Sequence, residues 1–354
     1  MSAQNWSICV VGGTGAEGTG AAELVDPMGV ALSPSGVLYV ADQKPGVIKQ
    51  FDATGRYLRS FGREGGGPGE FQVAFIAAAP GALVVQDPQT ARTSVFDSAG
   101  NFVRSWPSSC CYWSGISVSR DTVIHVQTGS VRPSESVPSE RLYLRYRMDG
   151  TLIDTMHVLA ESGEEPKVWR LSGGSGGEKW AMATGVPLAA RVSVALEPSG
   201  GAVVGWSGKY EFITTGSGRD TLQIVSLATT PVTVSEARRI EIRDSILSQF
   251  EQNYDPQIVR DAFKLTDIPS TAPLFEAIQV DGHRNRWVFR DDGGDRAAAR
   301  FDVFDSTGAY LGAAPVPSSF GSAAQTVWGM DRVATIAEDA EGLPVVVVYG
   351  IDRR

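Results

Sequence analysis

The sequence has little of several residue types that often reveal a function. Its 354 residues include only three cysteines and three histidines, and 31 basic side chains face 40 acidic ones. Three cysteines are too few for a disulfide framework, which favours a reducing compartment. The net charge of -9 argues against binding to a nucleic acid backbone. No apolar run approaches the roughly 20 residues that a membrane-spanning helix needs.

The first residues, MSAQNWSICVVGG, also lack the basic region and the long apolar region of a secretory signal. The chain as given is therefore expected in the cytoplasm, or in the periplasm or outside the cell if the native start is missing. With 42% apolar and 20% charged residues, the composition is typical of a soluble globular protein with a sizeable core.

A repeat with a period of 45 residues is present near the start of the chain. Residues 36–61, GVLYVADQKPGVIKQFDATGRYLRSF, align without a gap with residues 81–106, GALVVQDPQTARTSVFDSAGNFVRSW, and nine of the 26 positions are identical. Each copy contains an aspartate-to-glycine turn between alternating apolar segments, and the glycine supplies the positive φ of a tight hairpin. A period in the forties with several short strands is typical of β-propeller blades.

Weaker copies of these patterns predict further blades. The same hairpin recurs at residues 147–150 and 305–308, which marks a third and a fifth blade. A fourth blade is predicted by ALEPSGGAVVGW, because this segment is similar to ALSPSGVLYVAD and places Trp206 where the first blade has Asp42. Residues 326–351 have strand composition without a clear hairpin, and we assign them to blade six.

Two segments depart from the repeat. Residues 8–11 are an isolated apolar strand, which we expect to complete the last blade, since closure of the ring hides the edge strands. Residues 233–265 have helical spacing, with Thr233 and Glu236 as a capping box and Asp255 as the cap of a second helix. The expected apolar face of the first helix consists of Ala237, Ile240, Leu247 and Phe250. The predicted fold class is therefore all-β, a single six-bladed β-propeller domain over residues 1–354 with a short helical insertion between blades four and five.

The segments PMGVALSPSGVLYVAD, FDATGRYLRSFG and REGGGPGEF resemble the NHL-repeat family of six-bladed propellers, which is found in many bacterial proteins. The resemblance is strong over residues 26–106 and diffuse beyond them. It implies the propeller fold more than an activity, because the family includes lyases, lactonase-like relatives and modules that only bind.

Two glycine-rich motifs imitate enzyme signatures. Residues 13–18, GTGAEG, follow an apolar strand as in a dinucleotide-binding fingerprint, but no full helix and second parallel strand come after them. Residues 173–177, GGSGG, have the spacing of a hydrolase nucleophile, but a glycine tract does not form the strained turn that such a serine needs. We interpret the first as the loop after the closing strand and the second as a loop between blades.

Candidate metal ligands are few. The histidines lie at unlike positions of the repeat and are not expected to converge on zinc: His125, His157 and His283. The run RDDGGDR, with Asp291, Asp292 and Asp295, offers carboxylates for Ca²⁺ but lacks the alternating ligand order of an EF-hand. We interpret it as an exposed acidic turn. No cofactor and no metal are predicted, and Ca²⁺ is the one cation left open.

A small-molecule site in this fold is expected at the mouth of the central channel, where innermost strands begin and loops converge. The candidate binding residues at that mouth are Gln72, Trp113, Arg191, Glu276 and Gln325. Asp42 and Asp87 occupy equal positions of the repeat, so we expect them to cap loops. Trp113 also belongs to an apolar cluster with Cys110, Cys111 and Tyr112, which suggests packing between blades or an exposed patch for a partner.

No catalytic residue can be assigned. The poor catalytic inventory favours a non-enzymatic protein-binding or scaffold module, such as an extrinsic subunit of a larger, membrane-associated complex, with another protein as its partner and no nucleic acid. The alternative is a lactonase-like hydrolase or lyase that works at the channel mouth, with a divalent metal.

Overall fold

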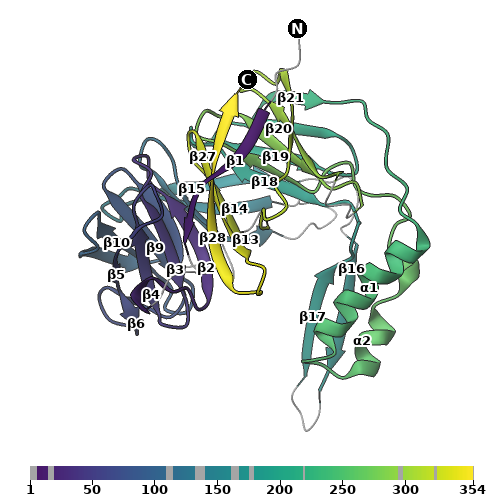
Figure 1. Ribbon diagram of the computed structural model, residues 1–354, viewed down its shortest axis with the longest axis horizontal. Helices are drawn as coiled ribbons and strands as arrows, with labels where there is room; N and C mark the ends of the chain where they lie inside the picture. Colours follow the sequence, from purple (N-terminus) through teal and green to yellow (C-terminus); the bar gives the residue numbers. More distant parts are fainter. Residues whose placement is uncertain are drawn as a thin grey trace.

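The structure is a computed structural model in which six four-stranded antiparallel sheets form a ring, so the predicted six-bladed β-propeller is confirmed (Figure 1). It describes residues 6–14, 20–108, 115–131, 140–160, 167–174, 179–217, 220–293, 298–322 and 325–353. Two α-helices lie between the fourth and fifth blades, as expected. No helix of these residues combines the length and apolar character required to cross a membrane.

The first three blades each begin with their innermost strand. Blade one consists of β2 (Pro27–Leu32), β3 (Leu38–Asp42), β4 (Val47–Phe51) and β5 (Tyr57–Phe61). Blade two consists of β8 (Phe75–Ala79), β9 (Ala82–Asp87), β10 (Arg92–Asp97) and β11 (Phe102–Pro107). Blade three consists of β12 (Ile116–Val118), β13 (Ile124–Val131), β14 (Glu140–Tyr146) and β15 (Leu152–Leu159). A short 3-10 helix, η1 (Gly20–Ala22), precedes blade one, and a parallel pair, β6 (Arg63–Glu64) and β7 (Glu70–Phe71), joins the first two blades.

The remaining blades follow the same order until the ring closes. Blade four consists of β18 (Val192–Leu196), β19 (Ala202–Trp206), β20 (Glu211–Thr215) and β21 (Thr221–Ser226). Blade five consists of β22 (Ala277–Val280), β23 (Arg286–Arg290), β24 (Arg300–Phe304) and β25 (Tyr310–Pro315). Blade six consists of β26 (Thr326–Trp328), β27 (Arg332–Glu338), β28 (Pro344–Arg353) and, as its outermost strand, β1 (Trp6–Thr14).

Aspartate side chains organise the hairpins that the repeat predicted. The Oδ1 atom of Asp52 accepts hydrogen bonds from the backbone N–H groups of Thr54 and Arg56 at 2.9 and 3.1 Å, and Gly55 has a φ of 86°. Asp97, Asp149 and Asp305 hold the corresponding hairpins of blades two, three and five in the same way. A short polar side chain that bonds to its own turn stabilises the hairpin locally, which explains why this part of the repeat is the most regular.

The two equivalent aspartates at the ends of second strands hold the connections between blades. Asp42 accepts a 2.7 Å hydrogen bond from the N–H of Asp26 and pairs with the buried Lys49 at 2.8 Å. Asp87 accepts a 2.8 Å bond from the N–H of Gln72. In blade four the hydroxyl of Ser207, one residue after Trp206, takes this role. It accepts a 2.9 Å hydrogen bond from the N–H of Arg191.

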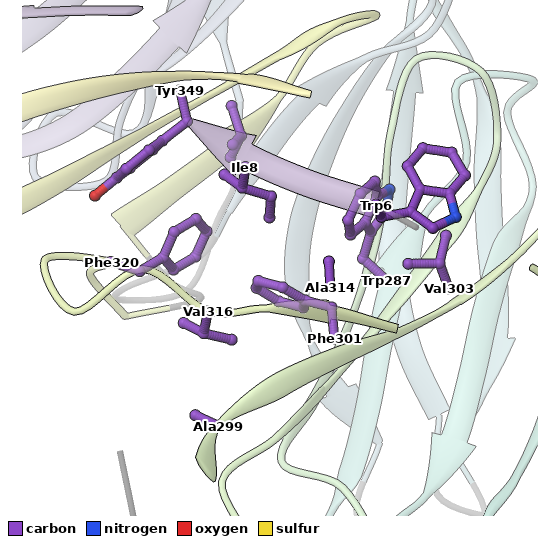
Figure 2. Close-up of a cluster of buried hydrophobic side chains, with 11 residues drawn as sticks. Trp6, Ile8, Trp287, Ala299, Phe301, Val303, Ala314, Val316, Phe320 and Tyr349 are labelled. Carbon is purple, nitrogen blue, oxygen red and sulfur yellow. The ribbon is translucent and has the colours of Figure 1, made fainter. Parts of the chain in front are cut away.

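Strand β1 completes blade six by antiparallel pairing with β28. Its inward side chains, Trp6 and Ile8, pack into an aromatic core between blades five and six (Figure 2). Within that core the indole of Trp6 lies edge-on to Trp287, with 5.2 Å between ring centroids. The burial of Trp6, Trp287 and Ile8 gives a strong hydrophobic contribution to the attachment of β1.

Blade six also has a hairpin that the sequence analysis overlooked. The turn between β27 and β28 is held by Asp339, whose Oδ1 accepts from the N–H groups of Glu341 and Leu343, and Gly342 has a φ of 79°. This turn joins the second and third strands of its blade, whereas the hairpins of the recognised repeat join the third and fourth. The aspartate-to-glycine turn of blade six therefore lies one strand earlier in its blade than the turns of the recognised repeat.

A lobe projects from the ring (Figure 1). It combines the hairpin of β16 (Val168–Gly173) and β17 (Trp180–Gly185) with α1 (Glu236–Phe250), α2 (Pro256–Ala262) and the short η2 (Leu265–Asp267). The lobe has its own core, in which the rings of Trp169 and Phe263 stack at 4.5 Å. The interpretation of residues 173–177 as a mere loop was therefore wrong at Gly173, which ends β16; residues 175–178 lie outside the described residues.

The helices differ in two details from the prediction. The cap of α1 is Ser235, whose side chain accepts from the N–H of Arg238, while Thr233 forms an isolated β-bridge with Thr271. Of the expected apolar face, Leu247 and Phe250 pack on the lobe core together with Ile242 and Ile246, whereas Ala237 is exposed and Ile240 is not part of that core. For α2 the prediction is confirmed, since Asp255 caps it and Val259 is fully buried.

Candidate functional site

The innermost strands of all six blades surround a central channel with a cavity of about 330 Å³. At one end, the loop mouth, connections between blades lead into the innermost strands. At the other end, the turn mouth, tight turns lead from the innermost to the second strands. The candidate binding residues that the sequence predicts are expected at the loop mouth, where the innermost strands begin.

A pocket of about 290 Å³ opens at the loop mouth between blades five and six. Its charged lining residues are Arg191, which precedes β18, Glu276, which precedes β22, and Asp291, which follows β23. Gln279, Ser322 and Thr326 add uncharged polar groups. The guanidinium of Arg191 forms an ion pair with the carboxylate of Glu276. The structure thus brings together two of the predicted channel-mouth residues, which are 85 positions apart in the sequence.

Aromatic side chains form the opposite wall of the pocket. The rings that line it are Phe289, Phe301, Phe320 and Trp328. They touch one another, with 5.6 Å between the centroids of Phe289 and Phe301 and 5.5 Å between those of Phe301 and Trp328. Phe301 and Phe320 also belong to the core in Figure 2, so the pocket is an open extension of the packing between blades five and six. Phe301 contacts each of the other three rings, so this wall is closely packed.

Glu276 is the most strongly perturbed group of the pocket. Its side chain is only 13% exposed. Burial raises the pKa of Glu276 to about 7, the ion pair with Arg191 partly opposes this, and the negative charge of Asp291 raises it further. The carboxyl is therefore shared between its two protonation states near neutral pH. Such a group exchanges a proton readily and responds to a charged ligand.

The other candidate residues lie away from this pocket or outside the described residues. Gln325 lines the channel cavity and also a neighbouring cavity of about 420 Å³ between blades six and one. Gln72 is exposed before blade two, where its carbonyl accepts from the side chain of Gln43, and it lines neither the channel nor the pocket. Trp113, together with Cys110, Cys111 and Tyr112, lies outside the described residues.

Among the candidate metal ligands, His157, His283 and Asp292 contact other charged groups, whereas His125 is buried with neither ring nitrogen hydrogen-bonded to a described residue. Burial lowers the pKa of His125 to about 4 with help from the charge of Arg145, while His157 contacts Glu140 at 2.7 Å and His283 contacts Asp331 at 3.0 Å. Asp292 pairs with Arg290 and Arg300, and Asp295 lies outside the described residues. Within the described ranges, no three histidine, cysteine or acidic side chains gather as a metal site would require.

The aromatic wall escaped the sequence analysis. Phe289 and Phe301 belong to adjacent strands of blade five, whereas Phe320 and Trp328 come from the connection to blade six and from its innermost strand. No local spacing relates these four positions. The one sequence signal was the high aromatic content of residues 287–328. Aromatic residues in strands are also typical of a hydrophobic core, so this content does not by itself predict a pocket wall.

Comparison with known proteins supports the fold. No family model matches this sequence, and no curated protein is similar enough to count as a relative. Among solved structures, a candidate exported protein of Bacteroides fragilis is similar with a TM-score of 0.50, 10% identity, and coverage of 97% of this chain and 94% of the other. A member of the DUF4221 family from Bacteroides vulgatus is similar with a TM-score of 0.50, 11% identity, and coverage of 99% and 97%.

A gluconolactonase of Xanthomonas campestris has a lower TM-score of 0.42, with 13% identity and coverage of 93% of this chain and 88% of the other. The two Bacteroides structures show that the chain has the fold of six-bladed propellers, and the gluconolactonase supports no conclusion. Membership of the NHL-repeat family itself stays a prediction.

Proposed function

We propose that this propeller binds a small organic cation, an amine on an apolar or aromatic body, in the pocket between blades five and six. The observation that supports this proposal is the combination of an aromatic wall with two carboxylates, Glu276 and Asp291, against the single guanidinium of Arg191. When both carboxylates are ionised, the pocket has one negative charge in excess. Aromatic faces attract cations as well, so charge and shape select the same ligand.

The protonation of Glu276 links this binding to pH. A bound ammonium group favours the ionised carboxylate, so binding of the amine lowers the pKa of Glu276. By linkage, the affinity for the amine rises as Glu276 loses its proton around pH 7. A neutral ligand of the same shape is not subject to this effect.

The test is titration calorimetry on the full chain with phenethylamine, phenethyl alcohol and phenylpropanoate. We expect the amine to bind best, and we expect Glu276→Gln and Asp291→Asn each to weaken it about tenfold, the usual size of a charge-assisted contact. Glu338→Gln is the matched control, because it removes a carboxylate from the neighbouring cavity. Equal binding of the alcohol, or equal weakening by the control, would show that the proposal is wrong.

The protein-binding or scaffold role is the second candidate, and the projecting lobe supports it. The lobe projects from the ring, which does not need it for closure (Figure 1), and the first turn of α1 is exposed at Ala237 and Arg238. Its partner would be another protein, either in the cytoplasm or outside it. Gentle extraction from native cells tests this role: co-elution with a partner that a lobe-surface variant loses would support it, and elution as a free monomer would contradict it.

A hydrolase or lyase at this mouth, the remaining alternative, would use Glu276 as acid or base, because a pKa near the working pH suits proton transfer. A panel of lactones and esters distinguishes it from simple binding. Turnover that Glu276→Gln abolishes would establish the enzyme. Inertness across the panel, with and without added Ca²⁺, would remove this alternative.

A further inference from the structure

The turn mouth of the channel has a built rim of its own. A cavity of about 410 Å³ is lined by turns of all six blades, including Ser33, Pro80, Arg120, Pro198, Gly282 and Met330. Hydrogen bonds tie neighbouring turns together: the N–H of Arg120 donates to the carbonyl of Pro198 at 2.8 Å, and the N–H of Gly282 donates to the carbonyl of Gly329 at 2.7 Å. The rim is therefore fixed by the backbone.

The floor of this cavity is apolar. Leu32, Val118 and Trp328, from the innermost strands of three blades, line it together with the side chain of Met330, which is 40% exposed. An exposed methionine beside an indole offers a contact surface that adapts to hydrocarbon groups. A ligand that fits here has an apolar body.

Two arginines on the rim supply positive charge. One amine of the Arg120 guanidinium donates to the carbonyl of Gly282 and contacts the sulfur of Met330 at 3.6 Å, and Nη1 of Arg332 donates to the carbonyl of Ala53 at 2.6 Å. Neither arginine forms an ion pair with any described residue. Each guanidinium has five N–H groups, so these contacts position the cation without using most of its donors.

The acidic groups nearby do not neutralise this charge. Asp331, the one acid among the described residues that line the cavity, is largely exposed and contacts His283 at 3.0 Å. Behind the rim, the buried carboxylate of Glu197 is shared by Arg284 and Arg286, and the charges of Asp281 and Asp305 also act on Arg286, so this cluster adds no excess of positive charge. Among the described residues that line the cavity, two arginines therefore face one exposed aspartate.

We propose that the turn mouth binds a small organic carboxylate, with its carboxylate on Arg120 and Arg332 and its hydrocarbon part on the floor near Trp328. Planar guanidinium groups suit a carboxylate, and the apolar floor favours a carboxylate with a hydrocarbon chain over inorganic phosphate. This site differs from the amine pocket at the loop mouth in its charged groups, since neither arginine lines that pocket, although Trp328 lines both cavities.

The test uses the full chain with hexanoate, hexanol, hexylamine and inorganic phosphate as calorimetric probes. We expect hexanoate to bind best and Arg120→Gln and Arg332→Gln each to weaken it about tenfold, as the loss of a charge-assisted contact does. Arg59→Gln is the matched control, because Arg59 also donates to a backbone carbonyl, that of Ala99 at 2.8 Å, but lies away from the cavity. The control is expected to bind hexanoate as the wild type does.

A position-specific readout accompanies the affinities. In protein with ¹³C-methyl methionine, hexanoate is expected to shift the Met330 resonance, which Met330→Leu identifies. Arg120→Lys, which keeps the charge but not the planar fork, provides a folded variant if Arg120→Gln does not fold, and it should weaken hexanoate less than removal of the charge. Equal affinity for hexanol or phosphate, equal weakening by Arg59→Gln, or an unmoved Met330 signal would overturn the proposal. Glu276→Gln should leave hexanoate binding unchanged.

Discussion

The two mouths of the channel have similar apolar surfaces and opposite charges. At the loop mouth two carboxylates face one arginine, whereas at the turn mouth two arginines face one exposed aspartate. Trp328 lines both cavities, because its indole stands between the channel and the core of blades five and six. One closed ring can therefore line its two ends with opposite excess charges, since different segments of each blade form each end.

The mouths also differ in how they are held. The loop mouth is built from connections between blades, whose lengths and sequences vary. The turn mouth is built from short turns that hydrogen-bond to one another, and behind it lies a buried ion pair between Glu197 and the fully buried Arg286, at 2.8 Å.

The largest expected effect is at the turn mouth. Glu197→Ala leaves Arg286 buried without its carboxylate, which should lower the free energy of unfolding by about 3–5 kcal/mol. Chemical denaturation measures this loss. The control is Asp154→Ala, whose carboxylate pairs with Arg145 but is 46% exposed, and which should cost within about 1 kcal/mol. Similar losses in both variants would contradict the special rigidity of the turn mouth.

At the loop mouth the expected effect depends on pH. Because the pKa of Glu276 is raised from 4.5 to about 7 on folding, the folded state loses stability as the pH rises across that interval. Glu276→Gln removes this loss, so its advantage over the wild type should grow from pH 4.5 to pH 7 and reach at most about 3 kcal/mol. Denaturant titrations at several pH values check the sign. An advantage that shrinks with pH would refute the assignment.

A smaller effect is expected from added volume at the rim. A Cβ at Gly282 would meet the sulfur and backbone of Met330 at 2.6 to 2.9 Å, so Gly282→Ala should destabilise the fold by about 1–3 kcal/mol through overpacking. Gly115→Ala is the control at the other end of the channel, where a Cβ meets no atom within 4 Å. Thermal denaturation compares the two. If both variants have the same unfolding temperature, the turn mouth accommodates the added methyl group and is less rigid than its hydrogen bonds indicate.

The smallest effect concerns the shared wall. Trp328→Phe shortens a side chain that lines both cavities, so the affinities for phenethylamine and for hexanoate should both fall, by about twofold to fivefold if roughly one methylene of contact is lost at each site. Calorimetry with both ligands measures this. Loss of only one affinity would show that the two sites do not share this wall.

Much of the fold could be predicted from local signals. The hairpins at Asp52 and Asp97 recur at one spacing and depend only on a side chain that bonds to its own turn, so the first two blades were legible residue by residue. The turn at Asp339 escaped because it joins different strands of its blade. The hairpin of β16 and β17 escaped because its partners, α1 and α2, lie more than 50 residues further along the chain.

Only the part of the candidate site that lies just before the innermost strands was predicted from the sequence. Residues just before innermost strands converge at the loop mouth, which selected Arg191 and Glu276 correctly as neighbours. The same rule failed for Gln72, because Asp87 holds the segment before blade two by its backbone. The aromatic wall forms only because blades five and six are neighbours in the ring. The two rim arginines reach the cavity only because of the direction of their side chains. Neither feature follows from a spacing of residues along the chain.

The seam between β1 and β28 has a mechanical consequence. The two strands run antiparallel, and Trp6 pairs with Arg353 at one end of the ladder, where the guanidinium lies 5.3 Å from the indole ring. A force applied between these two residues loads the hydrogen bonds one after another, as in opening a zipper, and does not shear them together. The ring should therefore open at its seam under low force, and the other five blades should yield only afterwards.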